Sequence, residues 1–158
     1  MARVRVDTKG LEEVKDFMTS RAANLVGGNR TIEIYFDNTG RPAALNAHIA
    51  QLNSLSYGRN PFFLRPGERG HLTKIMKKGV ETALRGRKRG FTGAVREAAK
   101  YIVEKFQQHL VSEDYNTPHK PLSDKYARWK KKKVGSEHPI LFLYGSLYES
   151  IKFRLKKG

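Results

Sequence analysis

The 158-residue sequence contains no cysteine, so disulfide bonds and thiolate metal sites are excluded and no redox compartment is indicated. Long hydrophobic runs are missing as well. The N-terminus has no apolar stretch of signal-peptide length, and no segment approaches the length of a transmembrane helix. These absences together predict a soluble, cytosolic product.

Acidic residues are scarce in this chain. Fifteen Asp and Glu stand against 31 Lys and Arg, which gives a net charge of +16 and a pI near 10.2. A field of this sign attracts polyanions. A nucleic-acid contact is one interpretation, and a basic surface that faces an acidic protein or simply water is the other. The 39% of hydrophobic residues, at this length, predict one globular domain over residues 1–158.

Patterns that carry catalysis are also missing. The histidines are scattered: His48, His71, His109, His119 and His138. The grouping most like a metal site, His109, Glu113 and His119, straddles a helix end without a spacing that fixes three ligands. No serine has the context of a nucleophile elbow, and no glycine-rich run matches a phosphate-binding loop. The sequence therefore predicts a protein that is not an enzyme and that uses no cofactor and no metal.

Hydrophobic periodicity predicts a mixture of strands and helices. Strands are expected at 3–7, 31–37, 43–52, 140–144 and 151–155, with 31–52 forming a hairpin. Helices are expected at 11–25, 67–89 and 92–112, and a short one after Ser123. The predicted fold class is α+β: a single domain in which an antiparallel sheet, made of the hairpin and the C-terminal strands, packs against two or three long helices.

The stretch 121–151 organises the chain. Ser123 is a candidate N-cap for a helix that carries Tyr126 and Trp129. Gly145 allows a sharp turn, and Ser146 with Glu149 three residues later has the spacing of a capping box. The residues that define this structural motif are Pro121, Leu122, Ser123, Gly145, Ser146, Leu147, Glu149, Ser150 and Ile151.

This motif resembles the C-terminal signature of tailed-bacteriophage virion-morphogenesis proteins, the tail-completion and head–tail joining family. That signature combines a Pro-Leu-Ser helix start, a basic spacer and an apolar pair with Thr-Gly-x-Leu-x-x-Ser-Ile. Gly145, Leu147, Ser150 and Ile151 fall at the matching spacing, with Tyr144 in place of the threonine. The stretch 58–66 is similar to the loop of that family that contains Pro-Phe-Leu-Arg-Pro, so the resemblance spans residues 43–155.

The resemblance implies a structural virion protein at the phage neck or at the head-proximal end of the tail. It implies a homo-oligomeric ring, expected to hold six or twelve copies, which completes the tail and joins it to the head. Expected neighbours are the head connector or adaptor, tail terminator or tail tube proteins, and genomic DNA in the channel, but no membrane. The expected location is the virion, with the host cytoplasm during assembly.

The aromatic loop 57–66 has two interpretations. Its aromatic side chains either plug the core or form an exposed patch that docks a neighbour. In the second case the subunit or neighbour interface consists of Tyr57, Arg59, Phe62, Phe63 and Arg65.

Two basic clusters form a predicted basic face: Lys74, Lys77, Lys78, Arg85, Arg87, Lys88, Arg89, Lys130 and Lys131. They support an alternative function, a small DNA-binding module that contacts phosphates through Lys74–Arg89. Trp129 could stack on a base beside the second cluster. The other interpretation places Trp129 on the sheet and leaves the lysines in water.

Overall fold

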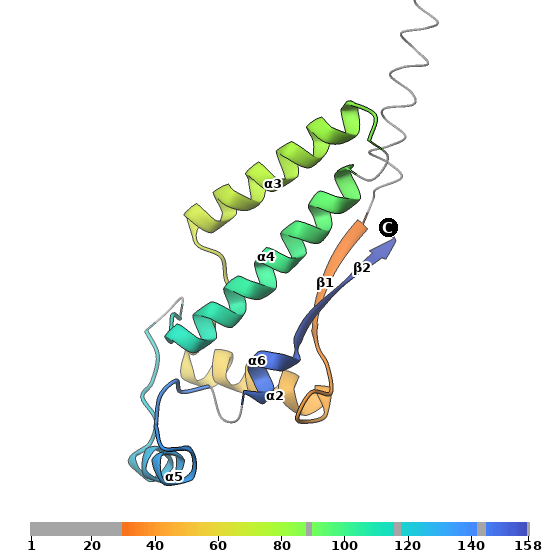
Figure 1. Ribbon diagram of the computed structural model, residues 1–158. Coiled ribbons are helices and arrows are strands. Elements are labelled where there is room, and N and C mark those ends of the chain that lie inside the picture. The colour runs from red at the N-terminus through yellow and green to blue at the C-terminus, as the bar shows by residue number, and fades with distance from the viewer. Residues whose placement is uncertain (1–29, 88–89, 116–117, 142–144, 158) are drawn as a thin grey trace, which may run out of the picture.

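The computed structural model describes residues 30–87, 90–115, 118–141 and 145–157, with the side chains of Arg30 and Lys157 left out. Within this part of the chain the order of elements is β1 (Arg30–Phe36), α2 (Ala43–Tyr57), α3 (Pro66–Leu84), α4 (Gly90–Ser112), α5 (Asp124–Val134), α6 (Ser146–Ser150) and β2 (Ile151–Lys157) (Figure 1). The predicted strand 3–7 and helix 11–25 lie outside the described residues.

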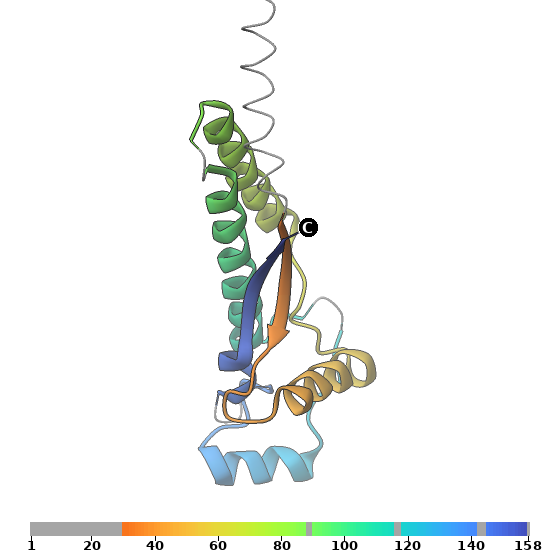
Figure 2. The same ribbon diagram turned by 90° about the vertical axis from the view of Figure 1, so that its right-hand side faces the viewer.

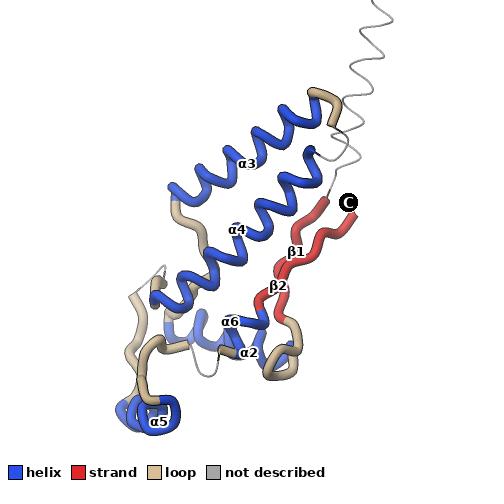
Figure 3. Tube along the Cα trace, viewed as in Figure 1, coloured by secondary structure: helices blue, strands red, loops and turns tan. Residues whose placement is uncertain are grey.

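The two strands pair antiparallel, from Arg30 opposite Lys157 to Phe36 opposite Ile151 (Figure 3). Because side chains alternate along a strand, Ile34 and Phe153 share one face of the sheet. This apolar face packs against α4. The other face is polar. There the Glu33 carboxylate of β1 forms ion pairs with two residues of β2, Arg154 at 2.6 Å and Lys156 at 2.7 Å.

Helices α3 and α4 form an antiparallel pair, and α4 lies between α3 and the sheet (Figures 1 and 2). Their contact is close because Gly79 has no side chain. A Cβ atom at this position would lie 2.2 Å from the Cβ atom of Ala94. Ile75, Ala94 and Ala98 form the buried centre of this pair, and Ile32 of β1 packs against them.

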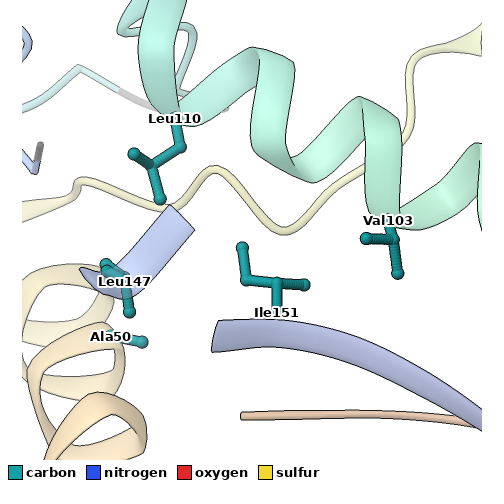
Figure 4. Packing of buried hydrophobic residues seen from close by; sticks show 5 residues of the cluster. All are labelled: Ala50, Val103, Leu110, Leu147 and Ile151. Carbon is teal, nitrogen blue, oxygen red and sulfur yellow. The ribbon is translucent and has the colours of Figure 1, made fainter. Parts of the chain in front are cut away.

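A second buried cluster joins four elements at the other end of the sheet. Ala50 of α2, Val103 and Leu110 of α4, Leu147 of α6 and Ile151 of β2 pack together there (Figure 4). Helix α6 runs directly into β2, so the Gly145–Ile151 turn places Leu147 and Ile151 in one core. The predicted fold class, α+β with an antiparallel sheet packed on helices, is confirmed, whereas the extent of a single domain over 1–158 stays a prediction.

The predicted return strand 43–52 is wrong, because these residues belong to helix α2. Asn38 Oδ1 accepts the backbone N–H of Ala43 at 2.9 Å, and Pro42, with φ −54°, directly precedes the helix. Gly58 ends the helix in the left-handed conformation, with φ 68°. The predicted hairpin 31–52 is therefore absent, and the partner of β1 comes from the C-terminal end of the chain.

Two details of the C-terminal motif also differ from expectation. Ile140 and Leu141 lie in a turn instead of a strand, and residues 142–144 lie outside the described part of the chain. Gly145, with φ 72°, is the N-cap of α6, so Ser146 is the first helical residue and not the cap. The sharp turn at Gly145 is as predicted, and Ser123 caps α5 by accepting the Tyr126 N–H at 3.4 Å.

Candidate interaction surfaces

The candidate metal grouping of His109, Glu113 and His119 is not assembled. Instead, Glu113 Oε2 lies 2.8 Å from His138 Nδ1, and the His119 ring packs edge-on against Tyr115. No group of three His, Cys, Asp or Glu that could hold a metal ion occurs among the residues that the structure describes. Nor does any helix of the described chain combine the length and apolar character needed to cross a membrane.

Arg59, a member of the predicted interface, is buried and is bonded within the chain. Its guanidinium donates to the carbonyl oxygen of Lys120 at 2.7 and 3.1 Å and to that of Pro121 at 2.9 Å. It also donates to Asn53 Oδ1 at 3.1 Å. Arg59 therefore fastens the segment that leads into α5 to the end of α2.

The aromatic side chains of the same loop also point inward. The Phe62 ring meets Phe36 and Phe106 edge-on, with centroid separations of 5.7 and 5.5 Å. Phe63 stacks on the ring of His109 at 4.5 Å. These contacts fit the interpretation in which the loop plugs the core. Of the predicted interface residues, only Tyr57 and Arg65 are exposed.

Buried His109 and partly buried Glu68 form a polar pair beneath this loop. His109 Nδ1 lies 3.2 Å from the Pro61 carbonyl oxygen, and Nε2 lies 3.1 Å from Glu68 Oε1. Burial raises the pKa of Glu68, but hydrogen bonds from the Arg65 N–H and from His109 outweigh it and hold that pKa below its usual value. The pair therefore links α3 to α4.

Helix α2 presents an exposed face without charge. None of its 15 residues is Asp, Glu, Lys or Arg, although charged residues make up 29% of the chain. Leu45, Leu52 and Leu55 recur at spacings that place them on one side of the helix, and they are 44%, 43% and 76% exposed. Ala50, on the opposite side, enters the core. The outer face of α2 is thus a mainly apolar patch, on which the exposed polar side chains of His48 and Gln51 also lie.

A groove continues this patch toward α5. Its volume is about 440 Å³. Apolar and aromatic side chains line it, namely Ile49 and Leu52 of α2, Leu122, Tyr126 of α5 and Ile140, together with Arg41 and Arg59. Tyr126 stacks on Trp129 with ring centroids 5.3 Å apart, and the two side chains are 40% and 46% exposed. Trp129 therefore does not pack on the sheet, and that prediction is wrong. The apolar patch and the aromatic pair border one continuous surface.

Helix α5 projects from the end of the molecule opposite the α3–α4 turn (Figures 1 and 2). At 11 residues it falls below the ~12–15 residues that an isolated helix needs in water. It makes no extensive contact with any other described helix or strand. Lys130 of α5 holds the helix against the loop that directly follows it.

Lys130 is fully buried, so its assignment to the basic face is wrong. Its Nζ donates to the carbonyl oxygens of Glu137 at 2.8 Å, Ile140 at 3.4 Å and Pro139. Burial lowers the pKa of this ammonium group, and the charges of Glu113 and Glu137 partly oppose the shift. Lys130 ties α5 to the loop that follows it.

The remaining basic residues divide between two ends of the molecule. Of the predicted basic face, five exposed cations lie on α3 and directly after it: Lys74, Lys77, Lys78, Arg85 and Arg87. Lys131 is exposed on α5, at the other end (Figure 1), and Lys88 and Arg89 lie outside the described residues. The structure therefore does not bring the two predicted basic clusters together.

Sequence reasoning missed the apolar face of α2 because the segment was interpreted as a strand. The signal was present, since 15 consecutive residues without a charge are unusual in so basic a chain. Compared with known proteins, the sequence matches no family model, no curated protein and no solved structure.

Proposed function

We propose that this chain is a structural assembly protein of a tailed-phage particle. It forms a ring with copies of itself at the neck or the head-proximal end of the tail, completes the tail and joins it to the head connector. The motif from Pro121 to Ile151, with its turn at Gly145, supports this proposal. The helical state of 43–52 removes one element of the resemblance, because that stretch was expected to supply a hairpin strand.

The observation that carries the proposal is the exposed, charge-free face of α2. Two copies that each carry a net charge of +16 repel one another across most of their surfaces. Contact between copies costs the least free energy where the surface carries no charged side chains, because no charge is then brought close to another and none loses its water. The cores of protein interfaces are depleted in charged residues and enriched in apolar and aromatic ones. The leucines of α2 meet both conditions, so we assign the next copy as the occupant of this face.

The surface that meets α2 on the next copy is the aromatic side of α5. A ring is built from heterologous contacts, in which one patch meets a different patch on the neighbour. Tyr126 and Trp129 are exposed side chains of the kinds that dominate binding energy. They also lie on a helix that makes no extensive contact with the other described helices and strands. Docking on α2 of a neighbour would supply the packing that α5 lacks.

The test changes one exposed leucine at a time and measures the mass of the purified protein by light scattering. Leu55→Glu places a charge in the α2 face, and Leu84→Glu places one on an exposed leucine of α3 that is 46% exposed. We expect the wild type and Leu84→Glu to form the same closed oligomer, and Leu55→Glu to be a folded monomer. A monomeric wild type, or an oligomer that survives Leu55→Glu, would contradict the assignment of α2.

A further inference from the structure

The outer side of α3 carries a row of cations. Lys74, Lys77, Lys78 and Arg85 are exposed there, whereas Ile75 and Gly79 face α4 and are buried. At a rise of ~1.5 Å per residue, the row from Lys74 to Arg85 is about 16 Å long. Figure 1 shows α3 on the outside of the molecule, with α4 covering its inner face. The row is therefore accessible to a large partner.

These cations have no acidic partners within the described chain. Acidic side chains form ion pairs elsewhere: Glu33 pairs with Arg154 and Lys156, Glu68 with His109 and Lys105, and Asp114 with Arg65. No ion pair within 4.0 Å involves Lys74, Lys77, Lys78 or Arg85 among the described residues. Glu81 is the only acid near them on the helix. The α3 row therefore has an excess of positive charge, with four cations against one acid on the same side of the helix.

The composition of this row indicates the class of its partner. Lysine is depleted in protein–protein interfaces, whose centres are apolar. Interfaces with nucleic acid are far more positively charged. The α3 row contains no aromatic residue between Lys74 and Arg85, and its exposed apolar side chain, Leu84, lies at the end of the helix. A phosphate backbone fits this chemistry better than an acidic protein does.

We infer that the α3 row is a binding site for the phosphate backbone of duplex nucleic acid. Three of its four cations are lysines, which act as point charges without the planar fork of arginine. Bidentate reading of adenine in a groove requires Asn or Gln, and α3 contains neither residue. The site therefore recognises charge and spacing, not sequence. This inference does not depend on ring formation.

Two charge-matched triple variants test the site. The first is Lys74→Gln, Lys77→Gln and Lys78→Gln on α3. The second is Lys131→Gln, Lys132→Gln and Lys133→Gln on α5, where the three lysines are also exposed. Both variants lower the net charge of the full chain equally. The measurement is the affinity for two short DNA duplexes, one of mixed sequence and one rich in A·T pairs, by fluorescence anisotropy over a range of salt concentrations.

We expect the wild type to bind both duplexes equally and to release them as salt rises. Each phosphate contact contributes about −0.9 to the slope of log K against log salt. The α3 triple variant should therefore make that slope shallower by about 2 to 3, and the α5 variant should leave it close to the wild-type value. Leu55→Glu, which is expected to prevent ring formation, should still bind DNA like the wild type. This variant therefore separates a failure of the ring proposal from a failure of the α3 site.

Three results would overturn the inference. The first is a wild type that does not bind the duplexes at low salt. The second is an equal loss in the two triple variants, which would assign binding to net charge instead of the α3 row. The third is displacement of the duplex by poly-glutamate at equal charge concentration, which would favour an acidic protein as the partner.

Discussion

At the scale of single residues, the burial of Lys130 is the least expected feature of the chain. Four adjacent lysines, Lys130 to Lys133, follow Trp129 in the sequence, and composition does not distinguish them. The structure does, because Lys130 has no exposed surface and donates to three backbone carbonyl oxygens. A lysine that satisfies buried carbonyls behaves as a structural cross-link, not as a surface charge.

We expect Lys130→Met to destabilise the protein by about 2 kcal/mol, because buried acceptors that lose their donor cost roughly 1–3 kcal/mol. Removal of a buried charge offsets part of that loss, since burial already lowers the pKa of this ammonium group. Urea unfolding measures the difference in the free energy of unfolding. The neighbouring exposed Lys131→Met is the control and should unfold like the wild type. Equal unfolding of both variants would show that the carbonyl contacts add nothing to stability.

At the scale of elements, the α3–α4 pair makes contrasting demands on two glycines of the same helix. A Cβ atom at Gly79 would lie 2.2 Å from Ala94 Cβ, whereas one at Gly70 would meet nothing within 4 Å. Gly79→Ala must therefore separate the helices, at a cost of about 1–3 kcal/mol. Gly70→Ala should instead stabilise the protein by about 0.5–1 kcal/mol through helix propensity.

Thermal unfolding measures both effects, because the same substitution of glycine by alanine is compared at two positions of α3. The melting temperature should fall for Gly79→Ala and rise for Gly70→Ala. A rise in both would mean that α3 and α4 are not in close contact at Gly79.

Local signals predicted some elements well. Strict alternation of Ile32, Ile34 and Phe36 identified β1, and the stripe through Val95 and Phe106 identified α4. These predictions succeeded because each segment is long and has a single period. The N-cap at Ser123 and the turn at Gly145 were also found, because a cap and a positive φ have local chemical causes.

Other elements had no local signal that could decide them. The run from Ala43 to Leu52 has too few large apolar residues to show a clear period, and the turn that precedes it suggested a hairpin. The pairing of β1 with β2 joins Phe36 to Ile151, and no pattern within either strand encodes such a distant partner. The inward orientation of Arg59 and Phe62 depends on this tertiary arrangement, so the sequence left it open between core and surface.

At the scale of the whole molecule, the surface chemistry is divided. Helix α2, which contains no Asp, Glu, Lys or Arg, lies at one end of the molecule with helix α5 (Figure 1). Helix α5 carries the exposed aromatic pair Tyr126–Trp129. The excess cations lie along α3. This division separates a surface suited to a protein neighbour from one suited to phosphates, so one copy could engage both partners at once.

The carboxyl groups and the net charge of the whole molecule together make its stability decrease as the pH falls. Hydrogen bonds from Arg154 and then Lys156 lower the pKa of Glu33 from 4.5 to about 2. Hydrogen bonds from Thr39 lower the pKa of Asp37, and the pKa of Glu68 is lowered as well. An acid whose pKa is lower in the folded state stabilises the fold above its unfolded pKa and loses that contribution as the pH falls. Protonation also adds to a charge of +16 and so increases repulsion within the fold.

We therefore expect the melting temperature to fall steadily from about pH 5 to about pH 2, the window between the unfolded and folded pKa values. Glu33→Gln removes the contact that ties β1 to Arg154 and Lys156 of β2. This variant should start with a lower melting temperature at neutral pH and lose less of it on acidification. Glu81→Gln is the control, because Glu81 has no ion pair within 4.0 Å among the described residues. If Glu33→Gln and Glu81→Gln follow the wild-type curve alike, the two-stranded sheet does not depend on Glu33, and apolar packing against α4 alone holds it in place.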